Sequence, residues 1–324
     1  IEKAARVSPG QGISAMQVIT ALEKDVLVPY QKRQVEEFKS GMQLIQSDRG
    51  GMVYQPKVGL HMDVAQVDFV SMYPAVIIKG NISPEVPLPN VLEPAREELG
   101  VVPLTLKPLY QKRVAIKNKV RQYPLDHPMV AVLKERANAL KWLLVVCFGF
   151  LGSKNARYGR IEAHEAVTKG GREVLLRAKE VAESEGFEVL HMYVDALWIQ
   201  KKGCSKQAHF TDVISKINLH TGLRINLDGN YRWVAFGVFQ SGEIKVRGLE
   251  SRRRDTPVWV AAVQKQMIAL LGHARTKAEL ADCIQEAFRY YYTSLEKLEK
   301  NQVPVEQLMI NGKVSYALDA YKAS

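Results

Sequence analysis

One segment constrains the fold of this chain more than any other. The run from Val64 to Phe69 is rich in β-branched residues and partly alternates with polar ones, so it predicts a strand. Directly after it, residues 71–74 (SMYP) predict a turn into a helix, since proline fits the first turn of a helix. Asp68 is therefore expected at the end of a strand, beside the amino end of a helix.

Two helical segments follow, with a proline-containing breaker between them at residues 123–128. In the first, Arg113 and Lys117 lie four residues apart and so share a face. In the second, an apolar stripe runs beside a mixed stripe that contains Lys141 and Phe148. Such a mixed stripe is typical of a helix that lines a cleft, although a solvated lysine edge has the same pattern.

A lone acid stands out in the second half of the chain. After a third amphipathic helix, which is expected to end near Gly186, the extended run from Phe187 to Gln200 carries Asp195 among apolar residues. An isolated buried carboxylate is costly in free energy. Asp195 therefore either is solvated in a turn or has a cation as its partner. More strand is expected at residues 231–246, and mostly helix from there to about Lys300.

Composition limits the class of protein. The 324 residues suffice for about two folded domains, and 47% hydrophobic with 24% charged residues argue against disorder. The net charge of +11 favours polyanions such as nucleic acid, although a nonspecific basic surface or an anionic-membrane binder would have the same total. No apolar run approaches the roughly 20 residues of a membrane span. Three widely spaced cysteines support neither a disulfide framework nor a zinc site, and favour a cytoplasmic setting.

The residues around Asp68 resemble motif A of the family B DNA polymerases. Residues 68–74 read DFVSMYP, against the family pattern DxxSLYPSII. In the family, the aspartate binds both metal ions, the backbone after it cradles the incoming triphosphate, and the tyrosine packs under the sugar and excludes a ribose 2′-hydroxyl. The resemblance implies these roles for Asp68, for residues 69–72 and for Tyr73. The amides at a helix amino end are also a natural phosphate site on physical grounds.

The second helix of the pair is similar to motif B, usually KxxxNSxYG. Lys141 takes the lysine position, while Val145 replaces the asparagine and Phe148 the tyrosine. Arg113 and Lys117 match the other basic pair of the family's fingers subdomain. The resemblance implies that these three cations grip the triphosphate and neutralise charge on the leaving pyrophosphate.

Residues 191–199 (HMYVDALWI) resemble motif C, usually YGDTDSLFV, in two possible alignments. One makes Asp195 the first aspartate and puts Leu197 at the second, metal-binding position, which predicts an inactive enzyme. The other aligns residues 195–199 with DSLFV, keeps the metal-binding aspartate and replaces only the first one, by Tyr193. We prefer the second, because it matches five consecutive positions and gives Asp195 a cation partner. The turn lacks glycine, so tertiary packing must hold it.

Three shorter elements extend the resemblance. Residues 49–51 are similar to the template-contacting YxGG element, residues 247–255 to the KGLExxRRD element, and residues 303–308 to a thumb segment. Glu250 would then be an auxiliary acid near the metals. The residues implied in DNA binding are Arg49, Gly50, Gly51, Lys245, Arg247, Arg252, Arg253 and Arg254.

The resemblance implies an α+β polymerase right hand with an antiparallel-sheet palm, two-helix fingers and a mostly helical thumb. The expected boundaries are an N-terminal remnant at 1–47, palm at 48–103 and 152–250, fingers at 104–151, and an incomplete thumb at 251–324. The chain begins with Ile1, so it is expected to start inside a longer gene product. Fewer than 70 residues precede Asp68, too few for the family's exonuclease, so no proofreading is expected from this chain.

The implied function is template-directed DNA synthesis in replication or repair, associated with the nucleoid. A primer 3′-hydroxyl would attack a deoxynucleoside triphosphate between two magnesium ions, for which manganese would substitute. The implied partners are primer-template DNA, deoxynucleoside triphosphates and a separate exonuclease or N-terminal subunit, with no membrane. The implied metal ligands are Asp68, Phe69 and Asp195, and the implied nucleotide-binding residues are Val70, Ser71, Met72, Tyr73, Arg113, Lys117 and Lys141.

Two other classes remain open at this point. Tyr193, Val145 and Phe148 stand where the family has polar groups, which motivates a pseudo-polymerase that binds primer-template DNA in a regulatory or structural role. The other class is an unrelated basic binding protein.

Overall fold

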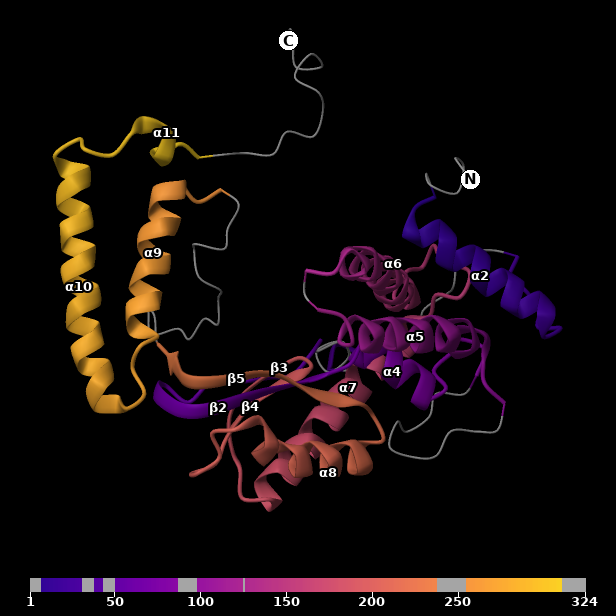
Figure 1. Cartoon of the computed structure of the whole chain (residues 1–324). Helices are drawn as coiled ribbons and strands as arrows, with labels where there is room; N and C mark the ends of the chain where they lie inside the picture. Colours follow the sequence, from indigo (N-terminus) through magenta and orange to yellow (C-terminus); the bar gives the residue numbers. More distant parts are fainter. Residues whose placement is uncertain are drawn as a thin grey trace, which may run out of the picture. The chain divides into compact units, whose positions relative to one another are not determined.

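The computed structural model of the chain describes residues 7–30, 38–42, 50–86, 98–124, 126–237 and 255–310 (Figure 1). The chain divides into two compact units: residues 1–57 with 63–231, and residues 58–62 with 232–324. Helices and an antiparallel sheet are both present, which confirms the mixed class of fold. The division into palm, fingers and thumb stays a prediction.

Among the described residues, the sheet has five strands in the order β1-β3-β4-β2-β5. Their bounds are β1 Val53–Tyr54, β2 Gly59–Phe69, β3 Glu188–Tyr193, β4 Ala196–Gln200 and β5 Ile225–Phe236. β4 pairs antiparallel with both β2 and β3, so that Ala196 lies opposite both Asp68 and Tyr193. The end of β2 therefore lies beside the β3–β4 hairpin turn.

Alternation along β2 decides where Asp68 points. Ala65, Val67 and Phe69 belong to the hydrophobic core, whereas Gln66 and Asp68 between them are partly exposed. The core face is covered by α7 (Ile161–Ser184), which packs on β3 and β4, and α7 in turn packs on α8 (Thr211–Thr221; Figure 1). Asp68 thus points to the opposite face of the sheet.

The described part of the first unit also contains the helices α2 (Pro9–Glu23), α4 (Met72–Lys79), α5 (Val101–Val120) and α6 (Pro128–Leu151). α5 packs against α6, and α2 packs against both. The apolar stripe expected on α6 is buried at Leu133, Ala137, Leu144 and Cys147. The sequence interpretation did not single out α2, whose start carries a capping box formed by Ser8 and the third helical residue.

The second unit contains α9 (Val258–Leu271), α10 (Lys277–Glu299) and α11 (Val305–Leu308). α9 packs against α10 and α11. Thr276 caps α10, and the helix ends at Glu299, which confirms the helical prediction to about Lys300. β5 begins at Ile225, six residues before the expected start of that strand, and it lies beside β2 in the sheet.

Some predicted residues lie outside the described part of the chain. These are Arg49, Lys245, Arg247, Glu250, Arg252, Arg253 and Arg254. Within the described part, no helix combines the length and apolarity that crossing a membrane requires.

Candidate active site

A strand-to-helix corner places Asp68 beside the amino end of α4, as the sequence predicts. The Phe69 N–H donates to the carbonyl oxygen of Asp195 at 2.9 Å, which fixes the end of β2 against the hairpin turn. The chain then turns at Ser71, which has φ 52° and ψ 57°. This left-handed conformation is uncommon outside glycine, and it lets α4 begin at the next residue.

The hairpin turn that carries Asp195 is held by contacts from a distant segment. Val194 has φ 57°, a costly conformation for a β-branched residue. Its N–H donates to the carbonyl oxygen of Met52 at 2.8 Å. A Cβ on Gly51 would lie 3.0 Å from the γ-carbons of Val194 and 3.0 Å from Tyr73 Oη. The absence of a side chain at Gly51 thus lets the turn and the tyrosine approach each other, in agreement with the expectation that packing holds a glycine-free turn.

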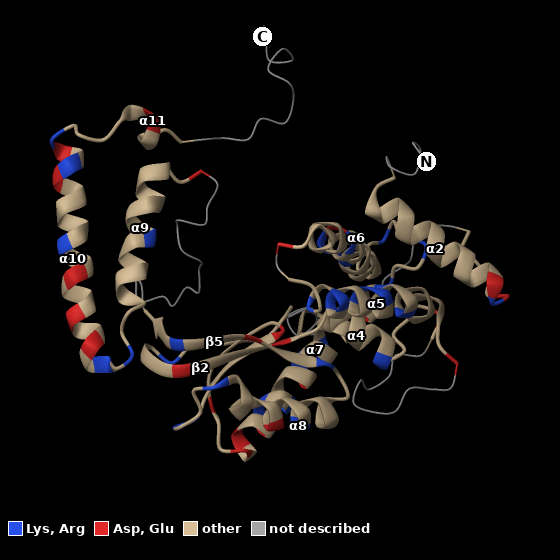
Figure 2. Ribbon diagram, viewed as in Figure 1, with Lys and Arg blue, Asp and Glu red and all other residues tan. Residues whose placement is uncertain are grey.

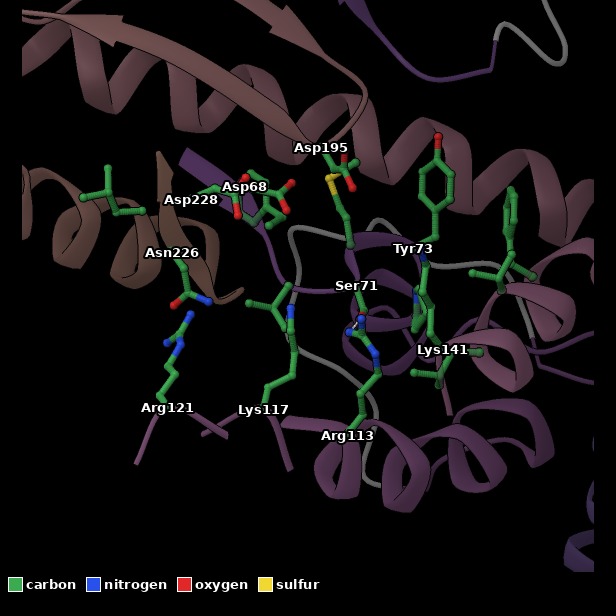
Figure 3. A pocket seen from close by; sticks show the side chains of 18 residues that line it. Asp68, Ser71, Tyr73, Arg113, Lys117, Arg121, Lys141, Asp195, Asn226 and Asp228 are labelled. Atoms are coloured by element: carbon green, nitrogen blue, oxygen red, sulfur yellow. Dashed lines mark hydrogen bonds between the residues drawn. The ribbon is translucent and has the colours of Figure 1, made fainter. Parts of the chain in front are cut away.

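One cavity of about 430 Å³ brings together predicted residues from distant parts of the chain (Figure 3). All of its lining residues belong to the first unit. The predicted residues that line it are Asp68, Phe69, Val70, Ser71, Met72, Tyr73, Arg113, Lys117, Lys141 and Asp195. They come from β2, the corner that follows it, α4, α5, α6 and the β3–β4 turn.

The two carboxyl groups on the acidic side of the cavity both have raised pKa values. Burial raises the pKa of Asp68 to about 7, and repulsion by Asp195 and Asp228 adds to the rise, while Lys117 and Arg113 oppose it. Burial also raises the pKa of Asp195, and Lys141 opposes that rise. A cation bound between these carboxylates would relieve both effects.

The basic side of the cavity is built on α5, which carries lysine and arginine but no acid (Figure 2). Arg113 donates from Nη1 to Ser71 Oγ, while its buried Nε has no hydrogen-bond partner among the described residues. Burial lowers the pKa of Arg113 and of Lys117, and the two cations repel each other. A phosphate at the amino end of α4 would offer a hydrogen-bond acceptor to the buried Nε of Arg113. Its negative charge would be balanced by Arg113 and Lys117.

The mixed stripe of α6 lines this cavity, so the cleft interpretation of that helix is confirmed. Lys141, Val145 and Phe148 all contribute to the wall. The Phe148 ring packs on Tyr73 with centroids 4.5 Å apart. Val145 and the packed rings of Phe148 and Tyr73 therefore form an apolar wall of the cavity, beside Lys141.

Three polar lining residues were missed by the sequence interpretation: Arg121, Asn226 and Asp228 (Figure 3). Arg121 continues the four-residue spacing of Arg113 and Lys117, so a signal for it was present. Asn226 and Asp228 lie on β5, where no local pattern marks them. Gln66 Nε2 donates to Asp228 Oδ2 at 3.4 Å, so this third carboxylate is tied to β2.

The carboxylates fit a magnesium site of a particular kind. Within the described ranges, no group of three or more His, Cys, Asp or Glu side chains forms an all-protein metal cage. Magnesium, however, is usually bound through one or two carboxylates together with substrate phosphates and water. Asp68 and Asp195 supply such a partial set, since both carboxylates line the same cavity.

The predicted template-contacting glycines border the site without lining it. Gly50 has φ 61°, and its carbonyl oxygen accepts from Arg172 Nη1 at 2.7 Å. Gly51 contacts Tyr73 and Val194 as described above. Their role in DNA binding stays a prediction.

Comparison with known sequences identifies one matching family. The profile described as "DNA polymerase family B" matches residues 11–210 and 231–324, which is most of the chain. The match includes both aspartates and all the cations that line the cavity.

Individual relatives agree with the family match. The chain is 28% identical to DNA polymerase 2 of Saccharolobus solfataricus over 313 residues, covering 90% of this chain and 46% of that protein. It is 29% identical to a DNA polymerase of Pyrococcus glycovorans over 347 residues, covering 98% of this chain and 43% of that protein. The chain therefore spans less than half the length of these curated relatives.

A solved structure is also similar. The family B DNA polymerase of Pyrobaculum calidifontis superposes with a TM-score of 0.60 at 26% identity, covering 98% of this chain and 42% of the other.

Proposed function

Because the chain belongs to family B of the DNA polymerases, we propose that it adds deoxynucleotides to the 3′-hydroxyl of a primer under the direction of a DNA template. Membership of this family excludes the interpretation as an unrelated basic binding protein. The activity, substrates and partners remain proposals, since the chain spans less than half of its curated relatives.

One observation carries this proposal. A single cavity has two half-buried carboxylates with raised pKa values on one side, and Arg113 and Lys117, whose pKa values are lowered, on the other. Phosphoryl transfer needs both, because a divalent cation is held by carboxylates while the triphosphate is held by cations. A structural salt-bridge network would instead pair the opposite charges directly.

In the proposed complex, Asp68, Asp195 and the Phe69 carbonyl would hold magnesium. The chemistry supplied by two such ions is activation of the attacking hydroxyl and neutralisation of the leaving oxygen. Arg113 and Lys117 would hold the phosphates, with Arg113 oriented by its bond to Ser71 Oγ. Arg113 and the two aspartates are partly shielded from solvent, which strengthens their interactions, because the surroundings screen charge less than water does.

The sugar and base of the nucleotide would rest on the apolar wall. Tyr73 is held between Gly51, Phe148 and Gly171, since a Cβ on Gly171 would lie 2.9 Å from Tyr73 Cε1. A ring fixed on three sides cannot swing aside for a larger sugar. Tyr73 is therefore proposed to exclude the ribose 2′-hydroxyl, and Lys141 to contact the triphosphate from α6.

A primer-extension assay with magnesium tests the proposal. The parent chain is compared with Asp68→Ala and Asp195→Asn, and with Asp212→Asn as a matched control, because the Asp212 side chain is 74% exposed on α8. We expect extension by the parent and the control, and at least a hundredfold loss in both site variants, about 3 kcal/mol of transition-state stabilisation.

Two other outcomes would each contradict one part of the proposed function. No extension by the parent chain, with primer-template DNA still bound, would contradict the enzyme and favour the pseudo-polymerase. Extension that is unchanged by Asp195→Asn would contradict the chosen alignment of motif C.

A further inference from the structure

A histidine stands behind the apolar wall of the cavity. The His164 ring, on α7, stacks on the Phe148 ring with centroids 4.3 Å apart and an interplanar angle of 21°. Phe148 packs in turn on Tyr73, with centroids 4.5 Å apart. Tyr73 and Phe148 line the cavity, whereas His164 is not among the lining residues. The three rings form a column in which the histidine is the outer member.

His164 also holds the backbone of the residue on which it stacks. The Phe148 carbonyl lies in the last turn of α6, where carbonyls lose their helical partners. The Gly152 N–H, four residues further on, donates to Phe150 instead. His164 Nδ1 lies 3.3 Å from the Phe148 carbonyl oxygen, and because a carbonyl can only accept, Nδ1 is the donor. One side chain therefore restrains both the ring and the main chain of Phe148.

Glycines leave room for the column at both ends. A Cβ on Gly152 would lie 3.1 Å from Cγ and Nδ1 of His164. A Cβ on Gly171 would lie 2.9 Å from Tyr73 Cε1, and one on Gly51 would lie 3.0 Å from Tyr73 Oη. Larger residues at these positions would displace a ring, so the column depends on close backbone approach from three segments.

We infer that His164 is a positioning residue for sugar selection: it holds Phe148 against Tyr73 and so sets how strongly the pocket rejects ribonucleotides. The inference rests on the proposed function, in which Tyr73 packs under the sugar. If His164 is removed, Phe148 loses a stacking partner and a backbone restraint. Tyr73 is then held less firmly by the Phe148 ring, and the larger ribose binds at a lower cost in free energy.

Three variants separate the two contacts. His164→Phe keeps a ring and loses the donor, His164→Asn keeps a donor near Nδ1 and loses the ring, and His164→Ala loses both. His220→Gln is the matched control, since His220 is exposed in the last turn of α8. The readout is the ratio of kcat/KM for dATP to that for ATP, in single-nucleotide extension of a primer-template.

We expect His164→Ala to lower this ratio by about three- to tenfold, the worth of one aromatic stack. The two partial variants should fall between it and the parent, and the control should match the parent. A role confined to stability would lower kcat/KM for both nucleotides equally and leave the ratio unchanged. An unchanged ratio in His164→Ala, with a parent-like circular dichroism spectrum, overturns the inference.

A second readout does not depend on catalysis. Binding of dATP and of ATP is measured by fluorescence titration on the full chain with primer-template DNA that ends in a dideoxynucleotide. If the parent extends no primer, the proposed function fails, and the ratio of the two dissociation constants decides the inference. A lower preference for dATP in His164→Ala supports it, and an equal preference in parent and variant overturns it.

Discussion

Replacing Asp68 by asparagine should stabilise the metal-free chain. The pKa of Asp68 rises from 3.8 to about 7 on folding, which at higher pH corresponds to about 4 kcal/mol of unfavourable free energy. The carboxylate is partly open to solvent, which screens the repulsion, so we expect a gain of about 1–2 kcal/mol. Asparagine has nearly the same shape and carries no charge, so it removes this cost without leaving a cavity.

The sign of the pH dependence follows from the raised pKa. An acid whose pKa is higher in the folded chain destabilises the fold only when it is ionised. The cost is absent below the unfolded pKa of 3.8, grows as the pH rises to about 7, and is constant above it. The gain from Asp68→Asn should therefore be full at about pH 8 and small at about pH 4.5.

Calorimetry with a chelator present measures this gain. At about pH 8 the transition temperature of Asp68→Asn should exceed that of the parent by about 2–8 °C. Magnesium should raise the parent's transition temperature and reduce the difference, because it binds the folded parent better than the variant. A variant no more stable than the parent at about pH 8, or equally stabilised at about pH 4.5, would refute the reasoning.

Three further changes have defined outcomes. Arg113→Ala should raise KM for deoxynucleotides about tenfold in single-nucleotide extension, because it removes a charged donor and frees Ser71; an unchanged KM argues against this phosphate role. In urea denaturation, Val194→Gly should raise the free energy of unfolding by about 1 kcal/mol, since it relieves the strain of a φ of 57° at this residue. A lower free energy of unfolding in the variant argues against that strain. Gly51→Ala should lower extension at least about tenfold by displacing Tyr73, and parent-like extension contradicts that contact.

Local periodicity predicted the elements that position the site. The alternation in β2, the apolar stripe of α6 and the lone acid Asp195 are properties of short windows, and the structure has each where the sequence indicates it. The corner at Ser71 was also predicted, because proline marks the first turn of the helix that follows. These features depend on neighbours close in sequence.

Features that depend on distant residues were not predicted. Asp228 reaches the cavity because β5 pairs into the sheet beside β2, and Gln66, which binds it, lies 162 residues away in sequence. The helix α2 is fixed by packing on α5 and α6 rather than by a strongly amphipathic sequence. The stack of Phe148 on His164 needs the relative position of two helices. A single sequence does not specify such long-range geometry locally.

The proposed function requires that the metal ion and the triphosphate bind in the same cavity. It is tested most directly by anomalous diffraction from manganese-soaked crystals of the chain with primer-template DNA and a non-hydrolysable deoxynucleoside triphosphate analogue. We expect manganese within about 2.2 Å of carboxylate oxygens of both Asp68 and Asp195, with the phosphates against Arg113 and Lys117. Manganese that leaves Asp195 without a contact, or a triphosphate bound elsewhere, would contradict it.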